Sequence, residues 1–188
     1  FSRSLKFDNF YTFDEKCLKN IVGGRVEKYN FKSDDGFLIT TGAYGEENLS
    51  IPQDESNYYG KIIFFDLNKR KPIIFSKGHR NPQGLFVGKN VILSTEHGDY
   101  GGDEINNIIY GQNYGYPISS YGENYKFRNR ILKERKNYEF LKSHIVNNFK
   151  EPIFSFIPSI GISQIITVPN SFSKYWNDNY LVASLNSR

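Results

Sequence analysis

Short β-rich runs dominate the pattern of hydrophobic and polar positions along the chain. Each run is a few apolar or β-branched residues long and is bounded by Gly, Asn, Asp or Pro, the residues that favour turns. This pattern predicts an all-β protein. The expected strands are Gly24 to Phe31, Gly36 to Thr41, Gly60 to Leu67, Pro72 to Ser76, Asn90 to Thr95, Asp103 to Tyr110, Glu151 to Phe156, Ser163 to Val168 and Asn179 to Ser184.

A weak repeat of about 50 residues relates three of these runs. In each of them a polar turn leads into an apolar run, which starts at Phe37, Val91 or Tyr180 and ends in small or hydroxylated residues. The spacing between the second and third runs is longer, which indicates an insertion. A period of this length that contains several strands is typical of the blades of a β-propeller.

The insertion is expected at about Tyr121 to Asn148. Its apolar residues recur at helical spacing amid Lys, Arg and Glu, and they are Ile131, Tyr138, Leu141 and Ile145. This spacing predicts one amphipathic helix from Ile131 to Val146 on the outside of the sheets. The charged stretch is interpreted either as a solvated face or as a basic docking surface.

Composition and charge exclude several classes of protein. The 188 residues carry 24 Lys and Arg against 20 Asp and Glu, a net charge of +4, and 38% are hydrophobic. These values predict a globular, soluble domain, and the scattered charge does not favour nucleic-acid binding. No run approaches the roughly 18 apolar residues needed to cross a bilayer. The single Cys17 allows neither an internal disulfide nor a cysteine-based zinc site. The chain starts without Met, and we expect a fragment of a longer polypeptide.

Polar residues with ligand-binding chemistry concentrate in three neighbouring segments. Arg80, Asn81 and Gln83 offer a guanidinium fork and amides, and a Gly-rich turn farther along leaves backbone carbonyls free for a hard cation such as calcium. The two turns flank one expected strand, so they should converge on an anionic ligand and a metal. Alternatively, the first turn is merely capped and pairs with Asp103 and Glu104. The three segments are Gly78 to Leu85, Glu96 to Asn106 and Gly111 to Pro117.

The same segments resemble the glucose/sorbosone dehydrogenases, or aldose sugar dehydrogenases, which use pyrroloquinoline quinone (PQQ). That family's pattern runs GHRNPQGL, STEHG, GGDEIN and GKNYGWP. Here it stands as Gly78 to Leu85, Ser94 to Gly98, Gly101 to Asn106, and Gly111 to Pro117 with Tyr116 in place of Trp. Weaker echoes extend the likeness to about residues 20–188. It implies a quinone-dependent oxidoreductase acting on the CH-OH group of sugars.

The resemblance also implies a fold and a set of site residues. The fold is a six-bladed β-propeller, of which residues 1–188 would form a single partial domain of three to four blades with one helical insertion. In the family, the residues matching Arg80 and Asn81 touch PQQ, and His97 is expected either to line the cofactor wall or to be structural. Backbone carbonyls at the positions of Gly98 and Asp99 hold the calcium ion. His79 is interpreted as structural.

The sequence departs from the family at three polar positions. Ile21 stands where the family has its catalytic histidine, so no catalytic residue is assigned. Asn186 stands where a basic residue helps to bind the cofactor, and Ala43 replaces an acidic residue. These losses imply impaired catalysis and weak retention of PQQ.

Two functions therefore remain open for the sequence. The chain belongs either to a sugar dehydrogenase whose base is Glu46, Glu47 or a residue elsewhere, or to a non-catalytic propeller that binds a carbohydrate, a metal or a protein. A third, plainer interpretation keeps the motifs only as turn-forming sequences. The expected partner is a sugar or another small polar ligand, with a protein partner as a further option and without nucleic acid or a membrane span. The resemblance implies a periplasmic or secreted location.

Overall fold

The computed structural model describes residues 4–13, 23–43, 50–123 and 140–186. These residues form strands and loops, with one 3-10 turn, η3 (Ile145–Asn147), as the helical element among them. The expectation of an all-β protein is confirmed. Within the same ranges, no helix is long and apolar enough to cross a membrane.

The first sheet is an antiparallel meander in the order β1-β2-β3-β4. Lys32 and Ser33, which connect its first two strands, both have positive φ, the backbone geometry of a tight hairpin turn that follows strand twist. The third strand is buried along its whole length, so it forms the centre of the sheet. The strands are β1 (Gly23–Phe31), β2 (Asp34–Thr41), β3 (Lys61–Asp66) and β4 (Lys71–Lys77).

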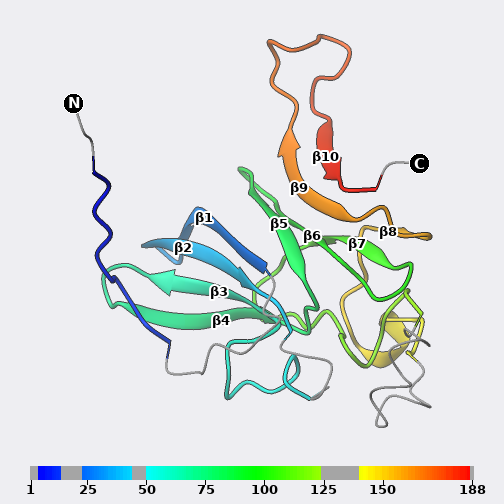
Figure 1. The fold of residues 1–188 in the computed structure, drawn as a ribbon, viewed down its shortest axis with the longest axis horizontal. Helices are drawn as coiled ribbons and strands as arrows, with labels where there is room; N and C mark the ends of the chain where they lie inside the picture. The colour runs from blue at the N-terminus through cyan, green and yellow to red at the C-terminus, as the bar shows by residue number, and fades with distance from the viewer. Residues whose placement is uncertain (1–3, 14–22, 44–49, 124–139, 187–188) are drawn as a thin grey trace.

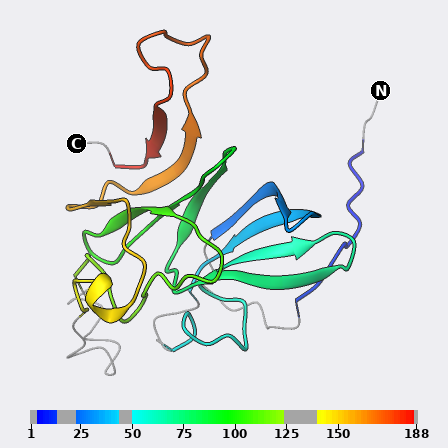
Figure 2. The same cartoon turned by 180° about the vertical axis from the view of Figure 1, so that it is seen from behind.

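A second four-stranded sheet and a hairpin follow along the chain. The second sheet has the order β5-β6-β7-β8, and the hairpin pairs β9 with β10, all antiparallel. The two larger sheets lie side by side, and the hairpin projects beyond β5 (Figure 1). The view from behind shows the same arrangement (Figure 2). The strands are β5 (Pro82–Val87), β6 (Ile92–Glu96), β7 (Asp103–Asn107), β8 (Phe154–Phe156), β9 (Ile162–Thr167) and β10 (Tyr180–Ser184).

The hydrophobic core lies where the two larger sheets meet. It joins residues of β2, β3 and β4 to residues of β5 and β6 and to the segment after β7. Burial of this many aliphatic and aromatic side chains supplies the main driving force for holding the sheets together. The buried members are Leu38, Ile62, Phe64, Phe75, Leu85, Ile92, Ile108 and Tyr114.

All nine expected runs coincide with strands, and the repeat has a structural basis. The three runs that define the repeat belong to β2, β6 and β10, each the second strand of its sheet in chain order. The sequence predicts a polar turn where the structure has strand β5, and this prediction is wrong. Pro82 occupies its first position, where no ladder hydrogen bond from its nitrogen is needed, and Gly84 packs against Thr95, so both residues are compatible with a strand.

The expected helix from Ile131 to Val146 begins outside the described residues. Over its described end the expectation is wrong, because Phe140 to Val146 form no α-helix. Leu141 instead makes an isolated bridge with Ser119, and Ser120 donates a backbone hydrogen bond to the Leu141 carbonyl at 3.0 Å. Pairing to another backbone segment therefore replaces helical hydrogen bonds there.

Lys61 is a fully buried lysine at the start of β3. Its Nζ donates to the carbonyls of Tyr59 at 2.6 Å and Ile51 at 3.0 Å, so it ties the loop before β3 to the sheet. Burial lowers the pKa of Lys61 to about 8, because the charged ammonium loses hydration. A neutral amine keeps two N–H groups, enough for both carbonyls.

The lowered pKa of Lys61 predicts that the free energy of unfolding rises with pH between about pH 8 and 10. Between about pH 8 and 10 the unfolded chain holds the Lys61 proton while the folded chain releases it, so the free energy of unfolding grows by up to about 1.4 kcal/mol per pH unit. In Lys61→Met this contribution disappears. Urea denaturation of both proteins across the window measures the difference, and parallel pH profiles would contradict the assignment.

Candidate functional site

Two polar turns meet at one end of the β5–β6 pair. The register sets Pro82 opposite Glu96, so the turn before β5 and the turn after β6 lie at the same edge. The His97 amide donates to the Asn81 carbonyl at 3.0 Å and extends this pairing. The sequence-based expectation that the turns converge is confirmed, and Arg80 and Gly98 line one cavity.

Glu96, the last residue of β6, lies buried against the first turn. Its Oε1 accepts a hydrogen bond from the Arg80 amide, and its Oε2 lies 2.9 Å from His79 Nδ1. The other ring nitrogen of His79 lies 2.8 Å from Ser76 Oγ, and the ring stacks on Tyr114 with centroids 4.7 Å apart. Both nitrogens of the fully buried His79 are therefore engaged, which agrees with its structural interpretation.

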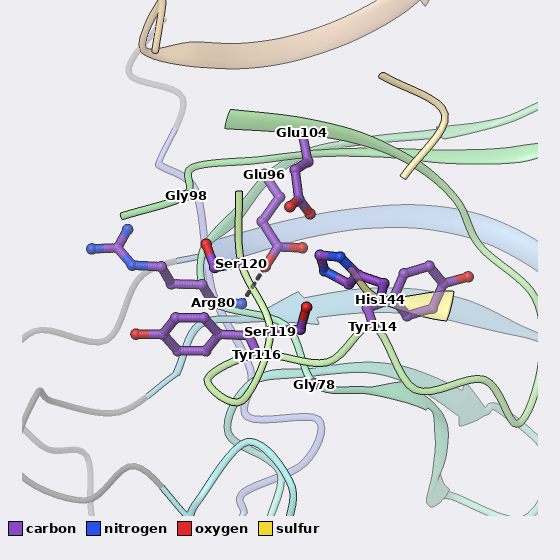
Figure 3. A pocket seen from close by; sticks show the side chains of 10 residues that line it. All are labelled: Gly78, Arg80, Glu96, Gly98, Glu104, Tyr114, Tyr116, Ser119, Ser120 and His144. Atoms are coloured by element: carbon purple, nitrogen blue, oxygen red, sulfur yellow. Dashed lines mark hydrogen bonds between the residues drawn. The ribbon is translucent and has the colours of Figure 1, made fainter. Parts of the chain in front are cut away.

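Arg80 places its guanidinium at the edge of this cluster. Its Nη1 donates to the His97 carbonyl at 3.2 Å, and its Nε lies 3.3 Å from Asp99 Oδ1. The side chain keeps 19% exposure, whereas that of Asp99 is fully buried. Figure 3 shows the guanidinium pointing away from Glu104 and His144, on the opposite side of the Arg80 backbone. A partly exposed cation is thus held in a fixed place.

Gly98 occupies the tightest point of the second turn. A Cβ on Gly98 would lie 1.8 Å from the Gly102 carbonyl oxygen, so no other residue fits without movement of the backbone. The Gly98 amide donates to Asp103 Oδ1 at 3.3 Å, and Asp103 Oδ2 accepts from the Ile162 amide at 2.9 Å. The buried Asp103 carboxylate therefore ties this turn to the start of β9.

The cavity behind Arg80 is small and contains titratable groups. Its volume is about 10 Å³, close to the space of one water molecule. Burial, together with the neighbouring Glu96 carboxylate, raises the pKa of Glu104 to about 8, and burial lowers the pKa of His144. The lining residues are Gly78, Arg80, Glu96, Gly98, Glu104, Tyr114, Tyr116, Ser119, Ser120 and His144 (Figure 3).

Sequence reasoning missed the His144 side of this cavity. The His144 ring stacks on Tyr121 with centroids 5.2 Å apart, and the Tyr121 hydroxyl donates to Glu151 Oε2 at 2.7 Å. Burial, followed by the hydrogen bond to Glu151, raises the pKa of Tyr121 to about 12. Tyr121 and His144 lie near the two ends of the expected insertion and Glu151 follows it, and no motif or spacing in the sequence links these residues to the two turns.

Other expected site residues have different positions. Asn81 and His97 do not line this cavity; the Asn81 side chain accepts from Gln83 Nε2 at 2.7 Å. The pairing of the first turn with Asp103 and Glu104 is not what these side chains show, since Asp103 binds Gly98 and Ile162, and Glu104 accepts from Asn106 at 3.3 Å.

The structure describes two of the three positions at which the sequence departs from the family pattern. Ile21, Glu46 and Glu47 lie outside the described residues. The Ala43 amide donates to the Arg80 carbonyl at 2.6 Å, which brings the end of β2 against the first turn. Asn186 is exposed, and its amide donates to the Ile160 carbonyl at 2.9 Å.

Comparison with known proteins gives the family. The model of the glucose/sorbosone dehydrogenase family matches residues 10–188. The chain belongs to this family. Over 170 residues it is 31% identical to the aldose sugar dehydrogenase YliI of Escherichia coli, which covers 81% of this chain and 43% of that protein. It is also 41% identical over 69 residues to quinoprotein glucose dehydrogenase B of Acinetobacter calcoaceticus, across 36% of this chain and 13% of that protein.

Solved structures share the fold. The apo-form of the soluble aldose sugar dehydrogenase from Escherichia coli matches with a TM-score of 0.72 and 24% identity, over 92% of this chain and 50% of that chain. The PQQ-bound aldose sugar dehydrogenase from Streptomyces coelicolor matches with a TM-score of 0.52, over 77% of this chain and 39% of that chain. The chain thus spans half or less of the length of these relatives.

Proposed function

We propose that this chain carries part of the cofactor site of a quinone-dependent oxidoreductase that acts on the CH-OH group of sugars. The observation that carries the proposal is the Arg80 guanidinium, which is held at a turn beside Gly98 and left partly exposed. A guanidinium fork suits the carboxylates of PQQ and the negative charge that develops on a quinone during reduction. Asn81 and His97, on the adjoining turns, are proposed as its neighbours.

The proposal includes a calcium ion held by backbone oxygens of the second turn. Within the described ranges, no three His, Cys, Asp or Glu side chains form a group that could hold a metal ion. Carbonyls of Gly98 and Asp99 supply the oxygen ligands that calcium prefers, and the close backbone contact of Gly98 with Gly102 gives the turn a fixed shape. Bound here, PQQ would supply the hydride acceptor for sugar oxidation, and calcium would supply Lewis acidity.

The chain's own residues support binding better than proton transfer. Arg80 provides the counter-charge, and its contacts with the His97 carbonyl and Asp99 limit its conformations. A proton acceptor for the sugar hydroxyl is expected at position 21, where isoleucine has no titratable group. We therefore propose that catalysis is impaired.

A non-catalytic propeller is the second candidate function. Ile21 and Asn186 favour it, because each replaces a polar group of the family with one that cannot do its chemistry. Such a protein would bind a carbohydrate, a metal or a protein through the same face. In either case the proposal includes a six-bladed ring to which this chain contributes three to four blades, and a periplasmic or secreted location.

Loss of Arg80 tests the cofactor proposal. Titration of the full-length protein with PQQ in the presence of calcium, followed by absorbance, is expected to show binding that Arg80→Ala weakens by about 10- to 100-fold, since a charge-assisted hydrogen bond is lost. The matched control is Arg70→Ala, because Arg70 lies in the β3–β4 turn over the Phe10 ring. Equal affinity in both variants, or no binding by the parent, would reject the proposal.

A further inference from the structure

The Glu96 carboxylate contacts two consecutive residues of the first turn. One oxygen accepts from the backbone amide of Arg80, and the other lies 2.9 Å from His79 Nδ1. Glu96 is 4% exposed and His79 is fully buried, so water does not compete for these contacts. A buried acceptor of this kind holds its donors firmly, because breaking the contact leaves a polar group without a partner.

The same carboxylate determines where the Arg80 backbone lies. The amide of Arg80 is bound by Glu96, and its carbonyl accepts from the Ala43 amide at 2.6 Å. The peptide unit before Arg80 is thus held by β6, and the peptide unit after Arg80 is held by the segment after β2. From this backbone the guanidinium reaches the His97 carbonyl at 3.2 Å and Asp99 at 3.3 Å.

Figure 3 shows that the Glu96 carboxylate and the Arg80 guanidinium lie in different directions from the Arg80 backbone. The Glu96 side chain approaches the backbone of Arg80, and the guanidinium extends in the opposite direction from the carboxylates of the cavity. Glu96 is therefore placed to act on Arg80 through its backbone amide.

We propose that Glu96 is the positioning residue for Arg80: its buried carboxylate locks the His79–Arg80 turn, so that the guanidinium is preorganised for an anionic ligand. The inference rests on the proposed function for the identity of that ligand, the carboxylate-bearing PQQ. Glu96 contributes to binding by fixing the position of the Arg80 guanidinium. A fixed guanidinium loses less conformational freedom on binding than a mobile one.

Three variants separate geometry from charge. Glu96→Ala removes both contacts. Glu96→Gln keeps them, because its amide oxygen accepts from the Arg80 amide and its NH₂ donates to His79 Nδ1 when the His79 proton is on the nitrogen facing Ser76. Asp66→Ala is the matched control: Asp66 is a buried carboxylate that accepts backbone hydrogen bonds from Asn68 and Lys69 in the distant β3–β4 turn.

PQQ titration with calcium gives the first measurement. We expect Glu96→Ala to bind about tenfold more weakly, and Glu96→Gln and Asp66→Ala to stay within about threefold of the parent. If Glu96→Gln is as weak as Glu96→Ala, the negative charge is what matters and the positioning role is overturned. Should Glu96→Ala fail to fold, Glu96→Asp, which is too short to reach both partners, takes its place.

A second measurement needs no ligand. The Arg80 side-chain Nε–H signal in a ¹⁵N NMR spectrum reports its ion pair with Asp99, and hydrogen exchange of the Arg80 amide reports the bond to Glu96. We expect Glu96→Ala to broaden the Nε–H signal and to speed exchange of this amide by at least about tenfold, while Glu96→Gln and Asp66→Ala change neither. An unchanged Arg80 in Glu96→Ala overturns the inference. Absence of PQQ binding by the parent would reject the proposed function alone, since this measurement still decides the role of Glu96.

Discussion

Ile21→His is expected to raise quinone-dependent aldose oxidation by the full-length protein by about 10²- to 10⁴-fold, the usual contribution of a positioned general base. Isoleucine cannot accept the hydroxyl proton that must leave as hydride passes to the quinone. The imidazole has to be neutral to act, so the regained rate should increase with pH through about 6.5. A dye-reduction assay with an aldose, calcium and PQQ measures this rate and its dependence on pH.

Ile21→Gln is the control for this gain. Glutamine introduces polarity without a titratable group, so it should leave both the low rate and its pH profile unchanged. Rapid aldose oxidation by the unmodified protein would show that another residue, such as Glu46 or Glu47, supplies the base. In that case the impairment proposal is wrong and the enzyme interpretation holds.

Gly98→Ala is expected to give the largest structural effect among small substitutions. The added methyl group would lie 1.8 Å from the Gly102 carbonyl oxygen, and the carbonyl carbon lies only 2.3 Å away. Because these neighbours are backbone atoms, the turn itself must move, at an expected loss of about 3 kcal/mol or more in the free energy of unfolding. The displaced carbonyls should also abolish calcium-dependent PQQ binding.

Gly101→Ala gives the matched control for this prediction. Gly101 lies in the same turn, has a φ of +93°, and would have no atom within 4 Å of an added Cβ. Its substitution therefore costs only backbone strain, about 1 kcal/mol. Chemical denaturation of both variants decides the matter, and equal stabilities would show that the Gly98–Gly102 contact is not needed.

The strand pattern could be predicted because short apolar runs and the turn residues that bound them are local properties of the sequence. The nine expected runs all fall on strands for this reason. Strand β5 was not predicted because Pro82 and Gly84 by themselves favour turns. Their place in a strand depends on the neighbouring strand, since Gly84 packs against Thr95. The helix expected at Ile131 to Val146 failed over its described end for a similar reason, since pairing of Leu141 with Ser119 overrides helical spacing.

Part of the candidate site could also be predicted from the sequence. One strand separates the two turns, so their convergence follows from antiparallel pairing, and Arg80 and Gly98 do line one cavity. The roles of Glu96 and His144 could not be foreseen. Glu96 meets His79 and Arg80 only through the β5–β6 register, and His144 comes from the long connection between β7 and β8. Long-range placement of this kind has no local signal in a single sequence.

The order of strands also bears on how the chain folds. In the first sheet, each strand pairs with the next one along the chain, so its contacts have short sequence separation and can form early. The second sheet differs, because β8 pairs with β7 only after residues 108–153 have been looped out. Doubling the length of such a loop costs only about 0.6 kcal/mol of closure entropy. An insertion between β7 and β8 thus slows completion of the second sheet far more than it weakens it, and this connection is where the architecture tolerates added length.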